Sequence, residues 1–294
     1  CSINYKGSSG GMEPVGATNC IKSIYDKTGA KVTHYLRDGD SKGFVRAKSS
    51  VDWPLTKQEC VNHIAKRMGT RLREVRKQLK LGGKGKLTNP AIDKMQRWYN
   101  HIIHNSEGDA VLMKEKIDAM HRHIGSNNRE PEHDDCHPTL CNYKFSLAKD
   151  DEYDHDDHFH ISKDIMDKIK PVFDALSDQD LLEKVTHGKT QNANESFNST
   201  VWNLLPKAGF ANRELVEWAV YMAVCLYNEG ELPVVRVLHS LDVEISERMV
   251  AMCQSIDQRR IYKKRKAEES KGTRRKRAKD ADDGEYDPGN CSYN

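Results

Sequence analysis

Apolar residues recur every three or four positions between Val61 and Leu79, and this spacing constrains the fold more than any other feature. It places them on one face of an α-helix, and that face must be buried against other elements. The positions are Val61, Ile64, Met68, Leu72, Val75 and Leu79. Similar patterns predict further helices at 90–123, 161–173, 181–185, 194–205, 212–229 and 234–261.

One segment, residues 20–37, has the composition of β-structure, ending in the β-branched and aromatic run 31–36. The run stops at Asp38-Gly39-Asp40-Ser41, and Ser41 is able to cap a helix that follows. These features predict a strand-to-helix turn. Because open α/β sheets present ligands and reactive groups at the carboxyl ends of their strands, Asp38 and Asp40 are candidate functional acids.

The overall composition, 37% hydrophobic and 31% charged over 294 residues, is that of a chain with a real core and excludes a disordered or collagen-like protein. The longest apolar run, 218–227, is about half the length that a membrane-spanning helix needs, so no membrane association is expected. The aromatic side chains of 202–227 are expected to fill the core. Eight scattered cysteines favour reduced thiols, some of them metal ligands, over a disulfide framework.

Charge is sorted into blocks along the chain. Residues 66–86 hold nine Lys and Arg against Glu74 alone, which predicts a DNA-phosphate contact; the alternative is an ordinary solvated helix face. The candidate DNA-binding residues are Arg67, Arg71, Arg73, Arg76, Lys77, Lys80, Lys84 and Lys86. Residues 150–160 are rich in acids and are expected to form a solvated loop, although their histidines also invite a metal-site interpretation.

The C-terminal segment from Tyr262 is charged and poor in apolar residues, so it is expected to be disordered. It contains two basic clusters that match a bipartite nuclear localisation signal and predict a nuclear protein. The clusters are Lys263, Lys264, Arg265 and Lys266, followed by Arg274, Arg275, Lys276 and Arg277.

Several Cys and His residues are candidates for a structural zinc site, which stabilises segments that lack a hydrophobic core. Cys60 and His63 are three positions apart on one face of a predicted helix. The other candidates lie in or beside the non-periodic stretch 125–160, which we interpret as an irregular insertion. Two closures are open: His123 with His133, Cys136 and Cys141, or Cys60 and His63 joined to Cys136 and Cys141.

Four segments in the same order, 4–17, 37–42, 59–73 and 187–198, resemble the Mutator-like transposase domain, including its Kolobok-type relatives. The last reads His-Gly-Lys-Thr-Gln-Asn-Ala-Asn-Glu-Ser-Phe-Asn and contains Glu195. The resemblance covers residues 4 to about 230. It implies an RNase H-like core in which two Asp and one Glu bind two Mg²⁺ or Mn²⁺ ions for DNA strand cleavage and transfer.

The resemblance assigns the second acid to Asp38 or Asp40, with Asp38 preferred, and the third to Glu195. The family's first Asp lies upstream of Asn4-Tyr5-Lys6, and no Asp precedes Asp26. We therefore expect either that a longer parent chain supplies it or that the gene is a decayed or truncated copy, and we expect the fragment as given to be inactive. The implied partners are transposon-end and target DNA, with self-association on DNA. The alternative is a non-catalytic, transposase-derived nuclear protein that binds DNA or zinc.

The expected architecture is α/β: an RNase H-like core with a mainly helical, zinc-binding insertion and a disordered tail. Residues 1–86 begin the core, 87–175 form the insertion, 176–261 complete the core with helices, and 262–294 form a basic and then acidic tail.

Overall fold

The computed structural model describes residues 5–38, 41–83, 86–106, 108–136, 141–149, 151–206 and 208–282, with side chains up to Glu269. These residues form two compact units, and the chain passes from the first to the second between Gln191 and Asn192. The fold is mostly helical, with one small parallel sheet of two strands in the described part of the chain. No helix in that part has both the length and the apolar character needed to cross a membrane.

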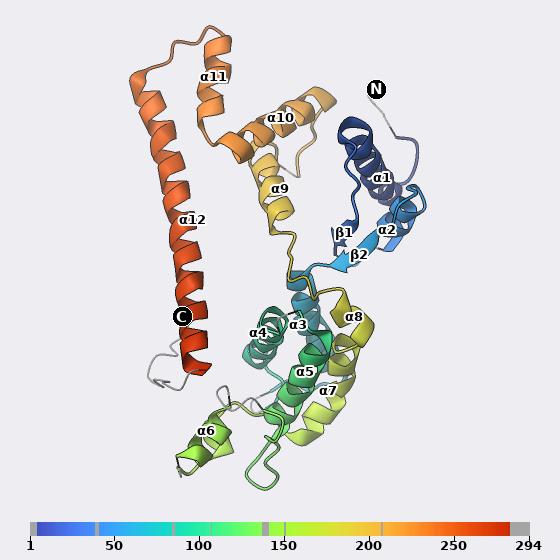
Figure 1. Ribbon diagram of the computed structural model, residues 1–294, viewed down its shortest axis with the longest axis vertical. Coiled ribbons are helices and arrows are strands. Elements are labelled where there is room, and N and C mark those ends of the chain that lie inside the picture. The colour runs from blue at the N-terminus through green and yellow to red at the C-terminus, as the bar shows by residue number, and fades with distance from the viewer. Residues whose placement is uncertain are drawn as a thin grey trace. The chain divides into compact units, whose positions relative to one another are not determined.

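The first unit opens with a small α/β lobe (Figure 1). Its elements are α1 (Ser9–Thr28), β1 (His34–Arg37), α2 (Ser41–Lys48) and β2 (Thr56–Glu59). The strands pair in parallel, with His34 opposite Thr56 and Arg37 opposite Glu59, and α2 forms the crossover between them. Ile21, Ala47 and Leu55 are the buried centre of the lobe.

The strand is shorter than the sequence predicted, because residues 20–28 belong to α1 and not to β-structure. Gly29 ends this helix in the left-handed conformation (φ 70°), and its N–H donates to the Tyr25 carbonyl. The strand-to-helix turn after β1 is confirmed, since α2 begins at Ser41.

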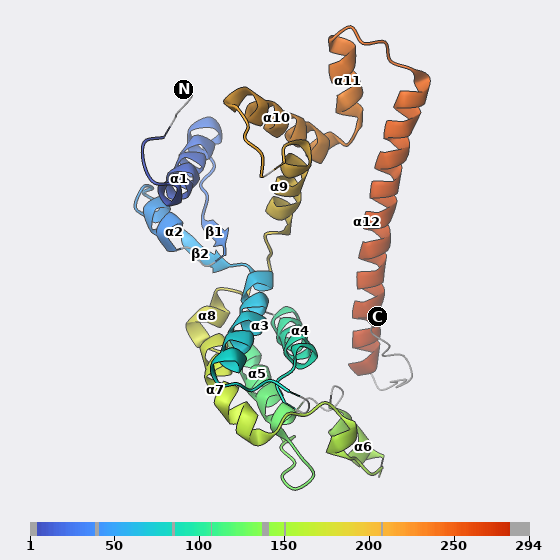
Figure 2. The ribbon, with the colours of Figure 1, turned by 180° about the vertical axis from the view of Figure 1, so that it is seen from behind.

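A helical bundle follows β2 (Figure 2). It contains α3 (Val61–Gln78), α4 (Asn89–His104), α5 (Ala110–Gly125), α7 (Lys163–Leu176) and α8 (Gln179–Glu183). The predicted apolar face of α3 is confirmed, with Val61, Ile64, Met68 and Leu72 fully buried in one core with the other four helices. The predicted 90–123 helix is two helices, because Asp109 caps the start of α5 by accepting from the N–H groups of Val111 and Leu112.

The stretch predicted as irregular is mostly so, but it contains α6 (Asn142–Ala148) and a 3₁₀ turn at His155–Asp157. No residue of α6 is buried. Both views show it standing apart from the bundle (Figures 1 and 2). Something other than a hydrophobic core must therefore hold this segment in place.

The second unit is built from α9 (Asn192–Leu204), α10 (Arg213–Glu229), α11 (Leu232–Ser240) and α12 (Glu247–Asp282). The sequence predicts disorder from Tyr262, whereas in the described part of the chain the backbone of α12 continues to Asp282. Its Lys, Arg, Glu and Ala residues are strong helix formers and no Pro interrupts them. Residues 283–294 lie outside the described part.

The aromatic side chains of this unit were expected in the core and are instead exposed, Trp218 at 48% and Tyr221 at 68%. Only Ala219 and Ala223 of α10 are buried, so the helix packs through its small residues.

We expect Tyr99→Phe to destabilise the bundle by about 1–3 kcal/mol, because a buried carbonyl then loses its partner. Tyr99 is fully buried in α4, and its hydroxyl donates to the Leu176 carbonyl at 2.9 Å, joining α4 to the end of α7. Urea unfolding with an unchanged m-value measures this loss. The control Tyr25→Phe, at a partly exposed ring, should stay within about 0.5 kcal/mol. Equal, negligible effects would contradict this role for the hydrogen bond.

Candidate metal centre and acidic strand end

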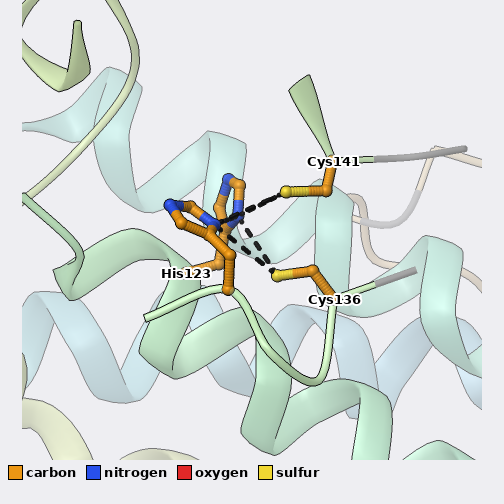
Figure 3. A group of neighbouring side chains, drawn as sticks. His123, Cys136 and Cys141 are labelled. Atoms are coloured by element: carbon orange, nitrogen blue, oxygen red, sulfur yellow. Dashed lines mark hydrogen bonds between the residues drawn. The ribbon is translucent and has the colours of Figure 1, made fainter. Parts of the chain in front are cut away.

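Four metal-ligating side chains converge beside the last turn of α5 (Figure 3). His123 belongs to that turn, His133 and Cys136 to the loop after it, and Cys141 immediately precedes α6. Their ligand atoms all lie within 4.8 Å of one another. The cluster therefore connects the end of α5 to the start of α6, the helix that has no buried residue.

The distances within the cluster fit a tetrahedral ion. The His123 and His133 Nδ1 atoms are 3.0 Å apart. The four sulfur–nitrogen distances run from 3.4 to 3.8 Å. Zinc with Zn–N near 2.1 Å and Zn–S near 2.3 Å separates tetrahedral nitrogen and sulfur ligands by about 3.6 Å and two nitrogens by about 3.4 Å. The sulfur–nitrogen distances therefore match a zinc site, and the two nitrogens lie about 0.4 Å closer together than a bound ion would set them.

Burial and hydrogen bonding prepare two of the donors, His133 and Cys141, whereas Cys136 would release its proton on binding a metal. Desolvation lowers the pKa of His133, which keeps the imidazole neutral and its lone pair available. The hydrogen bond between the two thiols lowers the pKa of Cys141 and raises that of Cys136. Two thiolates with two imidazoles form a donor set that suits Zn²⁺ and not the hard ions Mg²⁺ or Mn²⁺.

A histidine that the sequence interpretation missed lies directly behind this cluster. His155 is only 4% exposed, although it belongs to the acidic stretch expected to be a solvated loop. Its Nε2 lies 3.0 Å from His133 Nε2 and 3.0 Å from the Ser126 hydroxyl. No spacing motif marks His155; the one available signal was the aromatic Tyr153 among the acids, whose ring packs edge-on against the imidazole at 5.0 Å.

The alternative closure of the zinc site, through Cys60 and His63, is wrong. The Cys60 sulfur is 1% exposed and accepts from the Gln191 N–H at 3.3 Å. His63 Nε2 lies 3.6 Å from a carboxylate oxygen of Asp38. Both residues face the end of the small sheet, so they share a helix face, as predicted, but not the zinc cluster.

Asp38 directly follows β1 and its carboxylate is about half exposed, at 49%. Arg67 of α3 lies 3.4 Å from this carboxylate and 2.9 Å from that of Glu59, which is buried at the end of β2. An open hollow of about 430 Å³ lies over these groups, lined also by Lys66, Thr70 and Arg71. Asp40, the alternative acid, lies outside the described residues.

The chain returns to this strand end after the whole helical bundle. The Glu59 N–H donates to the Lys184 carbonyl at 2.9 Å, and His187 Nε2 lies 3.1 Å from the Glu59 carbonyl. The Gln191 side-chain amide donates to the Leu36 carbonyl at 3.2 Å. Burial lowers the pKa of His187 and so favours its neutral ring. The neutral ring donates from Nε2 to the Glu59 carbonyl and accepts at Nδ1 from the Lys189 N–H. Residues 184–191, here called the return loop, are thereby fixed to the ends of both strands.

Glu195, the third predicted acid, lies in the second unit, in the first turn of α9, and is exposed. Its side chain is four residues beyond Gln191, the last residue of the first unit. The return loop thus ends directly before the helix that carries Glu195.

The predicted basic residues that the structure describes divide into three groups. Arg73 pairs with Asp93 at 2.5 Å and Arg76 with the Asn89 side chain at 2.7 Å, so both connect α3 to α4. Arg67 and Arg71 line the hollow beside Asp38. Lys77, Lys80 and Lys86 are exposed, and Lys84 lies outside the described residues.

In the tail, the first basic cluster, 263–266, is exposed on α12. The side chains of 274–277 lie outside the described part of the chain.

Residues 1–141, slightly less than half of the chain, match the Mutator-like transposase family, and this similarity implies a DNA function related to transposition. The match confirms the resemblance carried by the first three sequence segments. No curated protein and no solved structure matches the chain.

We expect the purified chain to hold about one zinc per molecule by elemental analysis, because the cluster offers one complete tetrahedral donor set. Cys136→Ser or Cys141→Ser should lose the metal, whereas Cys20→Ser, at an exposed thiol, should keep it. Free zinc at 100 times Kd should raise the free energy of unfolding by about 2.7 kcal/mol. Full zinc content in both cluster variants would contradict this site.

Proposed function

We propose that this Mutator-like transposase domain binds DNA and that Asp38 and Glu195 contribute to a two-metal site for strand cleavage and transfer. The proposed setting is an RNase H-like core split by the helical bundle. Asp40 remains the alternative to Asp38. The observation that carries the proposal is the fixed return loop, in which Gln191 is hydrogen-bonded to Leu36, two residues before Asp38.

The return loop limits where Glu195 can lie. Four residues of chain span at most about 14 Å when extended and about 6 Å as a helix. Because α9 begins at Asn192, the helical value applies to most of this path. Two acids far apart in the sequence thus start from neighbouring backbone positions, which supports a shared site.

The small sheet supports the RNase H-like part of the proposal. A parallel strand pair with a helical crossover is the unit from which open α/β sheets are built, and such sheets carry their reactive groups at the carboxyl ends of strands. Asp38 occupies such an end. The bundle has its own hydrophobic core from Val61 to Val185, which favours starting the insertion at Val61.

The carboxylates fit the proposed ions, since Mg²⁺ and Mn²⁺ prefer oxygen ligands and Asp38 presents a half-exposed carboxylate to an open hollow. When bound, a pair of such ions activates the attacking water or 3′-hydroxyl and stabilises the leaving oxygen. Asp38 and Glu195 would hold these ions. Buried Glu59 holds Arg67, which in turn orients the Asp38 carboxylate.

The same hollow gives DNA a place beside Asp38. Lys66, Thr70 and Arg71 line it with two cations and a hydroxyl, the groups that contact phosphates, beside the acid Glu74. The neighbouring Lys77, Lys80 and Lys86 extend positive charge along the end of α3. We propose that the DNA backbone runs over this surface, that copies of the chain associate on DNA, and that the basic clusters of the tail direct the protein to the nucleus.

A second candidate function is a non-catalytic nuclear protein that binds DNA or zinc. The zinc cluster favours it, because that donor set is complete without either Asp38 or Glu195. Metal-directed cleavage separates the two functions.

We expect Fe²⁺, bound in place of Mg²⁺ and supplied with ascorbate and peroxide, to cut the polypeptide near both residue 38 and residue 195, since the radicals it makes react locally. Asp38→Asn or Glu195→Gln should each remove both sets of cuts, as read by mass spectrometry. The control Asp93→Asn, at an acid of α4 that pairs with Arg73, should leave the cuts unchanged. If the chain is cut near only one of the two positions, or if substituting one acid leaves the cuts near the other unchanged, the shared site is overturned. The non-catalytic function would then be the remaining candidate.

We expect Lys66→Ala combined with Arg71→Ala to weaken DNA binding and to reduce the slope of log affinity against log salt by about 1.8, the value for two lost phosphate contacts. The matched control is Lys170→Ala, at an exposed lysine of α7 that pairs with Asp174. Fluorescence anisotropy over a salt series measures both quantities. An unchanged slope in the double variant would remove this face of α3 from the DNA surface.

A further inference from the structure

A relay of hydrogen bonds, buried at His133, Ser126 and His155 and exposed at its far end, leads from the candidate zinc cluster to the acidic segment 151–160. Its members are His133, Ser126, His155, Asn128 and Asp154. We propose that His155 fixes the imidazole of His133 in its metal-binding form, and that metal binding and docking of the acidic segment are therefore coupled. This inference rests on the metal centre and does not depend on Asp38 or Glu195.

The proton positions follow from Asn128. Its Oδ1 accepts from the His155 backbone N–H at 2.9 Å and lies 2.7 Å from His155 Nδ1. Its Nδ2 donates to the Asp154 carboxylate at 2.7 Å, which fixes the orientation of the amide. An amide oxygen only accepts, so His155 Nδ1 carries the proton and Nε2 of the neutral ring is an acceptor.

This acceptor faces His133. His133 directs Nδ1 at the cluster, so its Nε2 carries the proton and donates across the 3.0 Å separation to His155 Nε2, or to Ser126 Oγ at the same distance. Metal-ligating histidines are oriented in this way by a partner on the second nitrogen. His155 is thus a positioning residue for the metal ligand His133.

The relay is also what holds the acidic segment. Asp154, Asp156 and Asp157 remain exposed, and their like charges oppose packing. His155 and the ring of Tyr153, whose pKa burial raises to about 12, are the groups of this stretch that face the cluster. Filling the metal site fixes the His133 proton that His155 accepts, and so stabilises the docked segment.

Two substitutions of His155 separate positioning from packing. Gln places its amide group near the position of Nε2 and retains an acceptor for His133, whereas Asn places its amide near Nδ1 and retains only the bond to Asn128. We expect His155→Asn to lower Zn²⁺ affinity by about 10–100-fold in a chelator competition with the full chain, and His155→Gln to stay close to the unaltered protein. His160→Asn, at a partly exposed histidine of the same segment, is the matched control and should leave the affinity unchanged.

Hydrogen exchange tests the coupling. Adding Zn²⁺ alone should slow amide exchange in 151–160 in the unaltered chain and in His155→Gln, but not in His155→Asn. The proposal is overturned if His155→Asn and His155→Gln lose affinity equally, or if neither loses affinity. It is also overturned if Zn²⁺ does not change amide exchange in residues 151–160. Absence of Zn²⁺ binding by the unaltered chain would overturn it as well. An Asp38→Asn variant should behave like the unaltered chain, so failure of the proposed DNA chemistry is distinguished from failure of this relay.

Discussion

The hydrogen bonds between the return loop and the strand ends are the constraint on which the rest of the first unit depends. They run from the Glu59 N–H to the Lys184 carbonyl and from the Gln191 side chain to the Leu36 carbonyl. The backbone groups at these strand ends would otherwise lack partners at the edge of a sheet of only two strands. These hydrogen bonds hold the end of the helical bundle against the sheet, beside Cys60, where the chain enters the bundle.

This closure explains how a large helical insertion leaves the sheet intact. The bundle has one continuous core of its own and enters and leaves at neighbouring points, so it folds as a unit between β2 and α9. The one part of the insertion outside that core, around α6, is held by the cluster of His123, His133, Cys136 and Cys141. A metal ion bound to this cluster would supply there the folding free energy that apolar burial supplies elsewhere.

Periodicity in the sequence predicted the helices well because burial of one face leaves a direct trace, as in Val61, Ile64 and Met68. It also identified the zinc ligands as a group, because Cys and His are few and their chemistry is specific. It could not choose between the two closures, since that choice depends on where α3 packs. The Cys60 sulfur accepts a hydrogen bond from the Gln191 N–H, and no local sequence pattern reveals a contact between residues so far apart in the chain.

Local charge was a poor guide where tertiary contacts override it. The acidic surroundings of His155 predicted solvation, yet the imidazole is buried behind His133. Arg71, Arg73 and Arg76 were all predicted to bind DNA, but Arg73 and Arg76 instead connect α3 to α4.

The proposal that most needs a direct test is that Glu195 and the acid at the end of β1 hold the same metal ions. A crystal structure of the full chain grown with Mn²⁺ tests this most directly, because anomalous scattering locates the ion without reference to the protein. The account expects Mn²⁺ between the carboxylates of Glu195 and Asp38 or Asp40, separated by less than about 8 Å, as paired ions about 3.5–4 Å apart require. Mn²⁺ bound elsewhere, with these carboxylates on opposite faces, would contradict it.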